Sequence, residues 1–177
     1  MRCLVALLCL AATSMAAQQP GFPTPDTARA VAAPTPEQQR FLDGLRTATR
    51  GIAQLKDALN RVTRAQGTRD ATAQRKAGRF LGGLCGSARA FMKRGRPQMN
   101  PTAYADSIAL LARRLVRQLD TLIAYAPTCE QGAAATPIPI ATDLGKRMKT
   151  YDLAWRDFRA AIGLPVKDDT AKTARRS

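Results

Sequence analysis

The sequence contains no histidine, and its 177 residues include only two glutamates, Glu37 and Glu130. Without histidine the chain has no imidazole for acid–base catalysis, for a Ser–His–Asp triad, or for most kinds of zinc and haem site. Carboxylate di-iron bundles are excluded as well, because they need paired Glu-x-x-His motifs. We therefore expect no cofactor and no metal, and the sequence marks no catalytic residue.

Aromatic residues make up only 5% of the chain, and valine and isoleucine are sparse, whereas alanine and leucine dominate. This composition favours helices over sheets. No stretch after residue 16 stays apolar over the roughly 20 residues that a membrane-spanning helix requires. The length suits a single domain with a substantial core.

Acidic residues are few as well, with 13 Asp and Glu against 28 Lys and Arg, a formal net charge of +15. Solvated charges on a helical surface explain most such residues. The functional alternative is attraction to anionic lipid, polysaccharide or acidic protein. Nucleic acid fits less well, because aromatic residues do not alternate with the charges. The basic residues that would form such a surface cluster in three places and are Arg89, Lys93, Arg94, Arg96, Arg113, Arg114, Arg117, Lys146, Arg147 and Lys149.

The first sixteen residues have the features of a secretory signal peptide. Arg2 supplies the positive start, residues 3–12 form a short apolar run, and residues 14–16 offer small side chains for cleavage. We therefore expect an exported protein, either periplasmic or fully secreted. Cleavage would remove Arg2 and leave 27 basic and 13 acidic residues, a net charge of about +14.

The segments on either side of the expected domain differ from it in composition. Residues 17–34 contain four prolines and little periodic apolar content, so we expect a disordered, flexible arm. Residues 164–177 are expected to form a polar, basic tail. The periodic pattern of a folded domain is confined to residues 35–163.

Within residues 35–163, apolar side chains recur in alternating steps of four and three along four segments, which is the heptad pattern of helices that pack on one another. Thr35 to Gln38 has the composition of a capping box with proline at the first helical position. The expected helices span about 36–65, 70–94, 101–126 and 142–162. In the third segment Gln118 interrupts the apolar pattern, and Leu119 beside it indicates a local rotation of the helix.

Each segment would bury a single apolar stripe, so we predict an all-α, antiparallel four-helix bundle with a heptad-patterned core. Glycine and proline at Gly67, Gly95 and Pro97 predict two short connections. Residues 127–142 hold three prolines and a glycine and are expected to form a long connection. That connection leaves the placement of the fourth helix open, and the oligomeric state is open as well.

Cleavage after residue 16 would leave two cysteines, Cys85 and Cys129, which in an exported chain predicts one disulfide. A straight hairpin of the second and third helices would put Cys85 about 24 Å along the axis from the end of the third helix. The residues between that end and Cys129 would reach only about 10 Å. A bridge within one chain therefore requires an earlier end to the third helix, a bend in the second, or else a second chain.

Three glycines give the expected second helix one smooth side, because Gly78, Gly82 and Gly86 are spaced four residues apart. Each costs about 1 kcal/mol relative to alanine in a helix, so we expect residues 127–142, or the backbone of a partner, to lie against them. A phosphate-binding loop is not indicated, because no strand precedes the glycines and no Gly-Lys-Ser/Thr follows.

Residues 35–38 resemble part of the Leu-Thr-x-x-Gln motif of small, ATP-independent periplasmic chaperones. Pro34 replaces the leucine of that motif and no second copy occurs, so we assign no family. Our leading hypothesis is a non-enzymatic exported protein that binds anionic envelope components or proteins through its basic surface. The alternatives are a holdase-like chaperone, and an enzyme that uses Lys, Ser or Asp in a cavity of the bundle.

Overall fold

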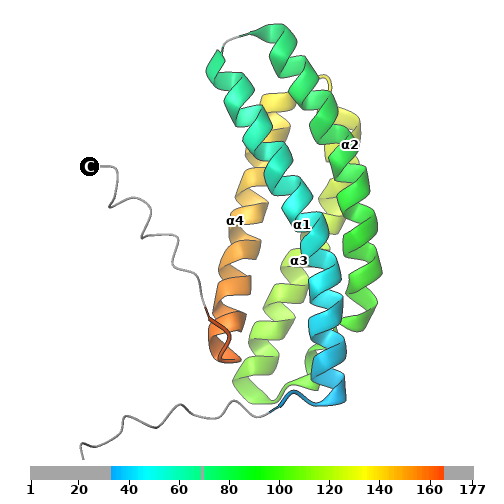
Figure 1. Ribbon diagram of the computed structural model, residues 1–177, viewed down its shortest axis with the longest axis vertical. Helices are drawn as coiled ribbons and strands as arrows, with labels where there is room; N and C mark the ends of the chain where they lie inside the picture. The colour runs from blue at the N-terminus through cyan, green and yellow to red at the C-terminus, as the bar shows by residue number, and fades with distance from the viewer. Residues whose placement is uncertain (1–32, 69, 166–177) are drawn as a thin grey trace, which may run out of the picture. The chain divides into compact units, whose positions relative to one another are not determined.

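A computed structural model of the chain describes residues 33–68 and 70–165. These two ranges form helices and contain no strand, so the predicted all-α four-helix bundle is confirmed (Figure 1). The predicted signal peptide (1–16), most of the predicted arm (17–34) and most of the predicted tail (164–177) lie outside the described residues. In chain order the elements are α1 (Pro36–Thr68), α2 (Ala71–Gly95), the 3-10 turns η1 (Arg96–Gln98) and η2 (Pro101–Ala103), α3 (Asp106–Gly132) and α4 (Pro137–Ala161).

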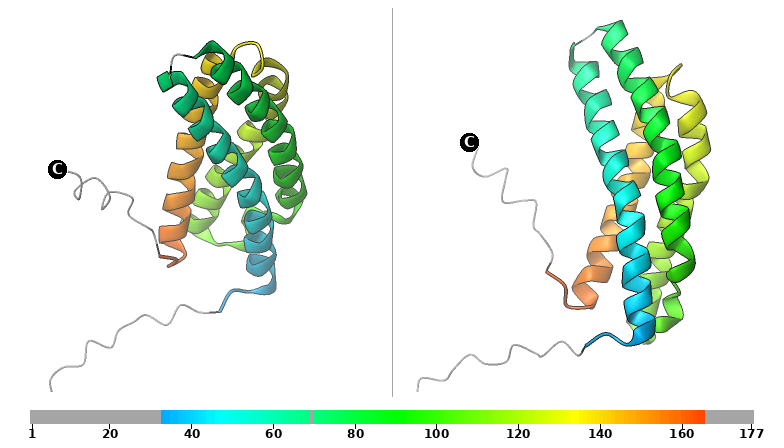
Figure 2. Two further views of the ribbon diagram at one scale, coloured as in Figure 1. Left: turned by 45° about the horizontal axis from the view of Figure 1, so that its top comes forward. Right: turned by 45° about the vertical axis from the view of Figure 1, so that its right-hand side comes forward.

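The four helices form two layers, with α1 and α2 antiparallel in one and α3 and α4 antiparallel in the other (Figures 1 and 2). Phe41, Tyr104 and Phe158 make an aromatic cluster in the core, and the ring centroids of each pair lie 5.2 to 5.3 Å apart. Leucine, alanine and methionine fill most of the rest, together with Tyr151, and no charged residue of the described ranges is buried. None of the helices in these ranges has the length and apolar character needed to cross a membrane.

The start of α1 follows the predicted capping box. The Thr35 amide donates a hydrogen bond to Oε1 of Gln38 over 3.0 Å, and the Gln38 amide donates to Oγ1 of Thr35 over 3.3 Å. Pro36 occupies the first helical position, where no intrahelical donor is needed. The predicted beginning of this helix is therefore confirmed.

The predicted beginning of the third helix is wrong. Asn100 does act as a cap, because its Oδ1 accepts a hydrogen bond from the Thr102 amide over 3.1 Å, but the element that it begins is the three-residue turn η2. The chain is then extended at Tyr104, whose ring enters the core and packs edge-on against both Phe41 and Phe158. Placing this ring keeps the backbone out of the helix, and α3 begins only at Asp106.

The predicted long connection over 127–142 is also wrong. α3 continues through Pro127 to Gly132, and only residues 133–136 separate it from α4. Pro137 is the first residue of α4 and Pro139 its third, and both positions lack an intrahelical acceptor for an amide in any case. Two of the prolines that favoured a loop are therefore residues of a helix start.

The buried stripe of α2 includes Ala77, Leu81 and Ala88, as the spacing predicts, but it is shifted by one residue at two other positions. Cys85 and Met92 are fully buried, whereas Leu84 and Phe91, which continue the predicted steps of four and three from Leu81 and Ala88, are half-buried. α2 lies very close to α1, since a Cβ added at Gly51 would meet the carbonyl oxygen of Ala88 at 2.5 Å. Small residues therefore face the neighbouring backbones and the larger side chains lie at the edges of the contact.

The third helix shows the local rotation that its sequence indicates. Leu119 is fully buried and the neighbouring Gln118 is only half-buried. Ala112 and Val116 are also buried, whereas Leu111 is half-buried. The buried side of α3 therefore contains small as well as large apolar residues. A heptad pattern that is assigned from the large residues alone misses part of it.

Candidate functional site

Cys85 of α2 and Cys129 of α3 form a disulfide within the chain, with their Cα atoms 6.0 Å apart. Both residues are fully buried. The separation expected for a straight hairpin, which would keep the two cysteines apart, does not apply, because α2 and α3 are not joined by a short turn. Gly82 lies against the carbonyl oxygen of Glu130. Residues of α2 and α3 that lie side by side are therefore about equally far from Ser107 in the sequence. The segment between them and the longer α3 together bring the two cysteines level.

The glycine strip of α2 has the role that its spacing predicts. A Cβ added at Gly78 would meet the carbonyl oxygen of Ala133, and one at Gly82 would lie 2.9 Å from the carbonyl oxygen of Glu130. The segment that lies against the strip belongs to residues 127–142, as expected, although most of it is helix. The disulfide and the glycines therefore hold the end of α3 tightly against α2.

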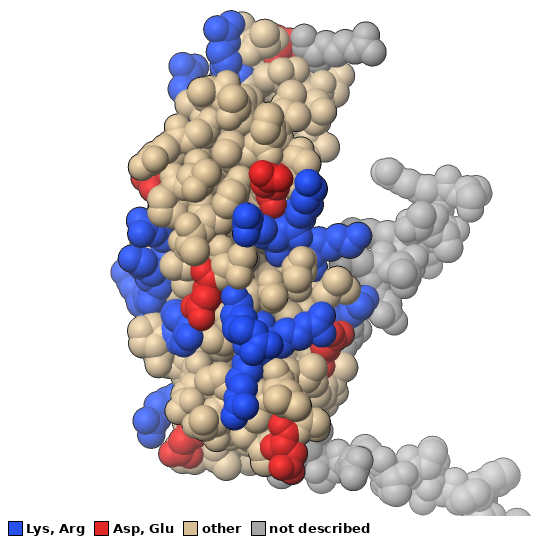
Figure 3. Space-filling model, turned by 180° about the vertical axis from the view of Figure 1, so that it is seen from behind, with Lys and Arg blue, Asp and Glu red and all other residues tan. Residues whose placement is uncertain are grey.

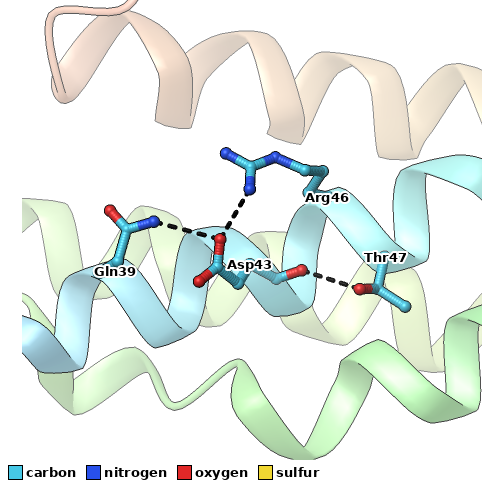
Figure 4. A network of polar contacts seen from close by, with 4 residues as sticks. All are labelled: Gln39, Asp43, Arg46 and Thr47. Carbon is cyan, nitrogen blue, oxygen red and sulfur yellow. Dashed lines mark hydrogen bonds and ion pairs between the residues drawn. The ribbon is translucent and has the colours of Figure 1, made fainter.

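The acidic residues of α1 are paired with basic residues of the same helix. Glu37 pairs with Arg40, and Asp57 pairs with Arg61 over 3.0 Å. Figure 4 shows the third case, in which Asp43 accepts hydrogen bonds from Arg46 over 2.8 Å and from Gln39 over 3.1 Å. Three of the six basic residues of α1 are therefore compensated within the helix.

α2 differs from α1 because it contains no acidic residue at all. Its basic residues form no ion pair within the ranges that the structure describes. At 100° per residue they all fall within about 140° of the helix circumference, in a sector that begins beside the glycines that lie against α3. All are exposed except the half-buried Arg89. We call these residues the α2 basic face: Arg75, Lys76, Arg79, Arg89, Lys93 and Arg94.

Three of the predicted basic-surface residues carry charge that the protein itself compensates. Arg96 binds Asp120 through two hydrogen bonds of 2.6 and 3.0 Å. Arg114 donates to Asp157 over 3.1 Å, and Lys146 lies 3.7 Å from Asp143. These residues tie the connection to α3, tie α3 to α4, and stabilise α4 itself. Exposed pairs of this kind contribute about 1 kcal/mol or less each.

The other predicted residues divide between α2 and the opposite layer. Arg89, Lys93 and Arg94 belong to the α2 basic face. Figure 3 shows the molecule from behind, where basic side chains gather over the middle and lower parts and a broad area above them carries few charges. Acidic side chains lie among the basic ones on this face (Figure 3). The remaining predicted residues, on α3 and α4, are Arg113, Arg117, Arg147 and Lys149.

Sequence reasoning missed the first half of the α2 basic face, namely Arg75, Lys76 and Arg79. The signal was available, because no acidic residue occurs between Asp70 and Asp106. A search for dense clusters of basic residues passes over this feature. A search for a long interval without acidic residues finds it.

No catalytic or metal-binding constellation stands out in residues 33–68 and 70–165. These ranges hold no group of three or more His, Cys, Asp or Glu side chains arranged to bind a metal ion. Comparisons with protein-family models, with curated proteins and with solved structures find no match to this chain. The site therefore has to be interpreted from its charges and its packing.

Proposed function

We propose that this protein is an exported, non-enzymatic binding protein that attaches to an anionic component of the cell envelope through the α2 basic face. The observation that carries the proposal is the contrast between neighbouring helices. Both helices have six basic residues, but α1 pairs three of them with its own three acidic residues, whereas α2 contains no acidic residue. Uncompensated charge of one sign along an exposed helix attracts a surface of the opposite sign.

Export is inferred from residues 1–16, and the disulfide between Cys85 and Cys129 is compatible with it. Envelope surfaces offer phosphate and carboxylate groups at high density, and each basic residue near an anionic lipid surface contributes about 1 kcal/mol to attachment. Six such residues on one helix are therefore sufficient for reversible binding without any apolar insertion.

The proposal predicts salt-sensitive binding. The protein should sediment with vesicles that contain anionic lipid at low ionic strength, and most of it should be released when salt is raised several-fold, because screening shortens the reach of the surface charges. Vesicles of phosphocholine lipid alone serve as the control. Binding that is equally strong at low and high salt would contradict an electrostatic attachment.

The alternatives from the sequence gain no comparable support from the described ranges. A catalytic site in a bundle cavity would place polar side chains in the core, and the core of these ranges consists of apolar residues. The large exposed apolar side chains there are Phe80, Leu110 and Leu164, and Arg61 covers the ring of Phe80 at 4.3 Å. We therefore base the proposed function on charge.

A further inference from the structure

A shallow cleft of about 340 Å³ lies between α2 and α3, and its lining residues are Gly86, Arg89, Ala90, Lys93 and Glu130. It is placed beside the disulfide, because Gly86 and Glu130 directly follow the two bridged cysteines in the sequence. The bridge therefore fixes the spacing between the two walls of the cleft.

One wall of the cleft carries two cations. Arg89 and Lys93 are four residues apart and so lie on the same side of α2, one turn from each other. Neither forms an ion pair with any described residue, and Nε of Arg89 is buried without a hydrogen-bond partner. A guanidinium beside an ammonium suits the oxygens of a phosphate group.

The opposite wall carries a single carboxylate. Glu130 lies over Gly86, where an added Cβ would be 2.8 Å from Oε1, so glycine makes room for the carboxylate. Within the described ranges Glu130 has no ion pair and no side-chain hydrogen bond, not even with Arg89 or Lys93. Its oxygens are therefore free to accept hydrogen bonds from a cationic group.

We propose that this cleft binds a group that carries a phosphate and a primary ammonium a few bonds apart, as phosphoethanolamine does. Arg89 and Lys93 hold the phosphate, and Glu130 accepts hydrogen bonds from the ammonium. The mixed charge of the cleft selects against the simpler ligands, because Glu130 repels a bare phosphate and the two cations repel a bare amine. This inference rests on the proposed function and deepens it, since it names the headgroup chemistry recognised at one end of the α2 basic face.

The test uses the full chain and three soluble probes: O-phosphoethanolamine, inorganic phosphate and ethanolamine. Titration followed by NMR or calorimetry at low salt should show that phosphoethanolamine binds about tenfold more tightly than phosphate, which is the effect of one additional charge-assisted hydrogen bond. Ethanolamine should bind more weakly than either. Equal affinity for phosphoethanolamine and phosphate in the natural protein, or no binding of phosphoethanolamine, overturns the proposal.

Variants assign the contacts. Glu130→Gln should remove the preference for phosphoethanolamine over phosphate, and Arg89→Gln should weaken the binding of both. Glu37→Gln is the matched control, because Glu37 is the only other glutamate and lies at the start of α1. Melting curves confirm that each variant is folded. A preference that persists in folded Glu130→Gln contradicts the assignment.

Vesicles separate the two sources of such a group. Phosphoethanolamine and phosphocholine headgroups differ in the ammonium, and only the former has N–H groups to donate to Glu130. If vesicles with phosphoethanolamine headgroups bind better than vesicles with phosphocholine headgroups, and Glu130→Gln removes the difference, the source is a lipid. If only the soluble probe shows the preference, the source is a free small molecule. Both results support binding of the group in the cleft. An absence of salt-sensitive binding to anionic vesicles would contradict the proposed function and would leave the binding in the cleft unaffected.

Discussion

Gly44 of α1 and Gly95 of α2 face each other where the two helices approach. A Cβ added at Gly44 would lie 2.6 Å from the carbonyl oxygen of Gly95, and a Cβ added at Gly95 would meet the carbonyl oxygen of Gly44. Contacts this short with backbone atoms cannot be relieved by moving a side chain. The pair therefore sets how closely the first layer of the bundle packs.

Gly44→Ala should lower the free energy of unfolding by about 1–3 kcal/mol, because the cost of overpacking exceeds the gain in helix propensity. Gly83→Ala in α2 is the control, since a Cβ added there meets nothing within 4 Å, and it should raise stability by up to about 1 kcal/mol. Urea unfolding measures both. If Gly44→Ala were more stable than the natural protein, α1 and α2 would be able to move apart without a loss of stability.

The contact between α2 and α3 predicts the effect of a larger side chain on the glycine strip. Gly82→Leu should lower the melting temperature, because the carbonyl oxygen of Glu130 leaves no room for a Cβ and a leucine would push the end of α3 away. The gain in helix propensity, about 1 kcal/mol, cannot offset this displacement. An increase in melting temperature would argue against close packing of α3 on the strip.

The disulfide should contribute substantially to stability. Its cysteines are 44 residues apart, and closing a loop of that length in the unfolded chain is worth about 4 kcal/mol in the chain-entropy description. The double variant Cys85→Ser with Cys129→Ser should therefore unfold at markedly lower urea. In a chain that begins at residue 17, thiol titration under denaturing, non-reducing conditions should find no free thiol. Two free thiols in the native protein would refute the pairing.

Two buried tyrosines predict how stability depends on pH. Burial raises the pKa of the Tyr104 hydroxyl from 10.0 to about 12, and burial also raises the pKa of Tyr151. Neither hydroxyl has a partner within hydrogen-bond distance in the described ranges, and the interaction of Tyr151 with the Thr49 side chain opposes the rise in its pKa without cancelling it. The unfolded chain releases these protons first, so stability is fully present below about pH 10 and is lost as the pH rises through 10 and 12.

Tyr151→Phe checks this assignment. The variant lacks a buried hydroxyl without a partner, so at pH 8 its stability should equal or exceed that of the natural protein. Its loss of stability between pH 10 and 12 should be smaller, because one ionising group has been removed. Unfolding curves at several pH values give both quantities, and an unchanged slope would count against burial as the cause.

Much of the architecture could be predicted from the sequence, because four segments repeat apolar residues at helical spacing and the capping box at Thr35 marks a helix start. The exact start of α3 could not be predicted, since it depends on Tyr104 reaching the rings of Phe41 and Phe158 across the core. The 127–142 segment was predicted as a connection because it holds three prolines. Pro137 and Pro139 lie in the first turn of α4, which suits proline, and Pro127 lies inside α3, where proline is ordinarily unfavourable. Composition alone does not separate these two positions.

The candidate site was predicted only in part, for a related reason. Three basic clusters are visible in the sequence, yet whether a charge is compensated depends on distant partners such as Asp120 for Arg96 and Asp157 for Arg114. The pairing of Cys85 with Cys129 was expected, but its geometry depends on where α3 begins. The cleft over Gly86 needs both helices in register and has no local signature.

A charge-matched comparison of two triple variants tests the central claim most directly. One removes Lys76, Arg79 and Arg94 from the α2 basic face by substitution with glutamine. The other replaces Arg40, Arg46 and Arg61, which pair with acidic residues of α1, in the same way, so that each variant loses three positive charges. Binding to vesicles with anionic lipid at low salt should fall about a hundredfold in the α2 variant, at roughly 1 kcal/mol per basic residue, and should change little in the α1 variant. An equal loss in the two variants would show that binding follows net charge and that the α2 basic face has no special role.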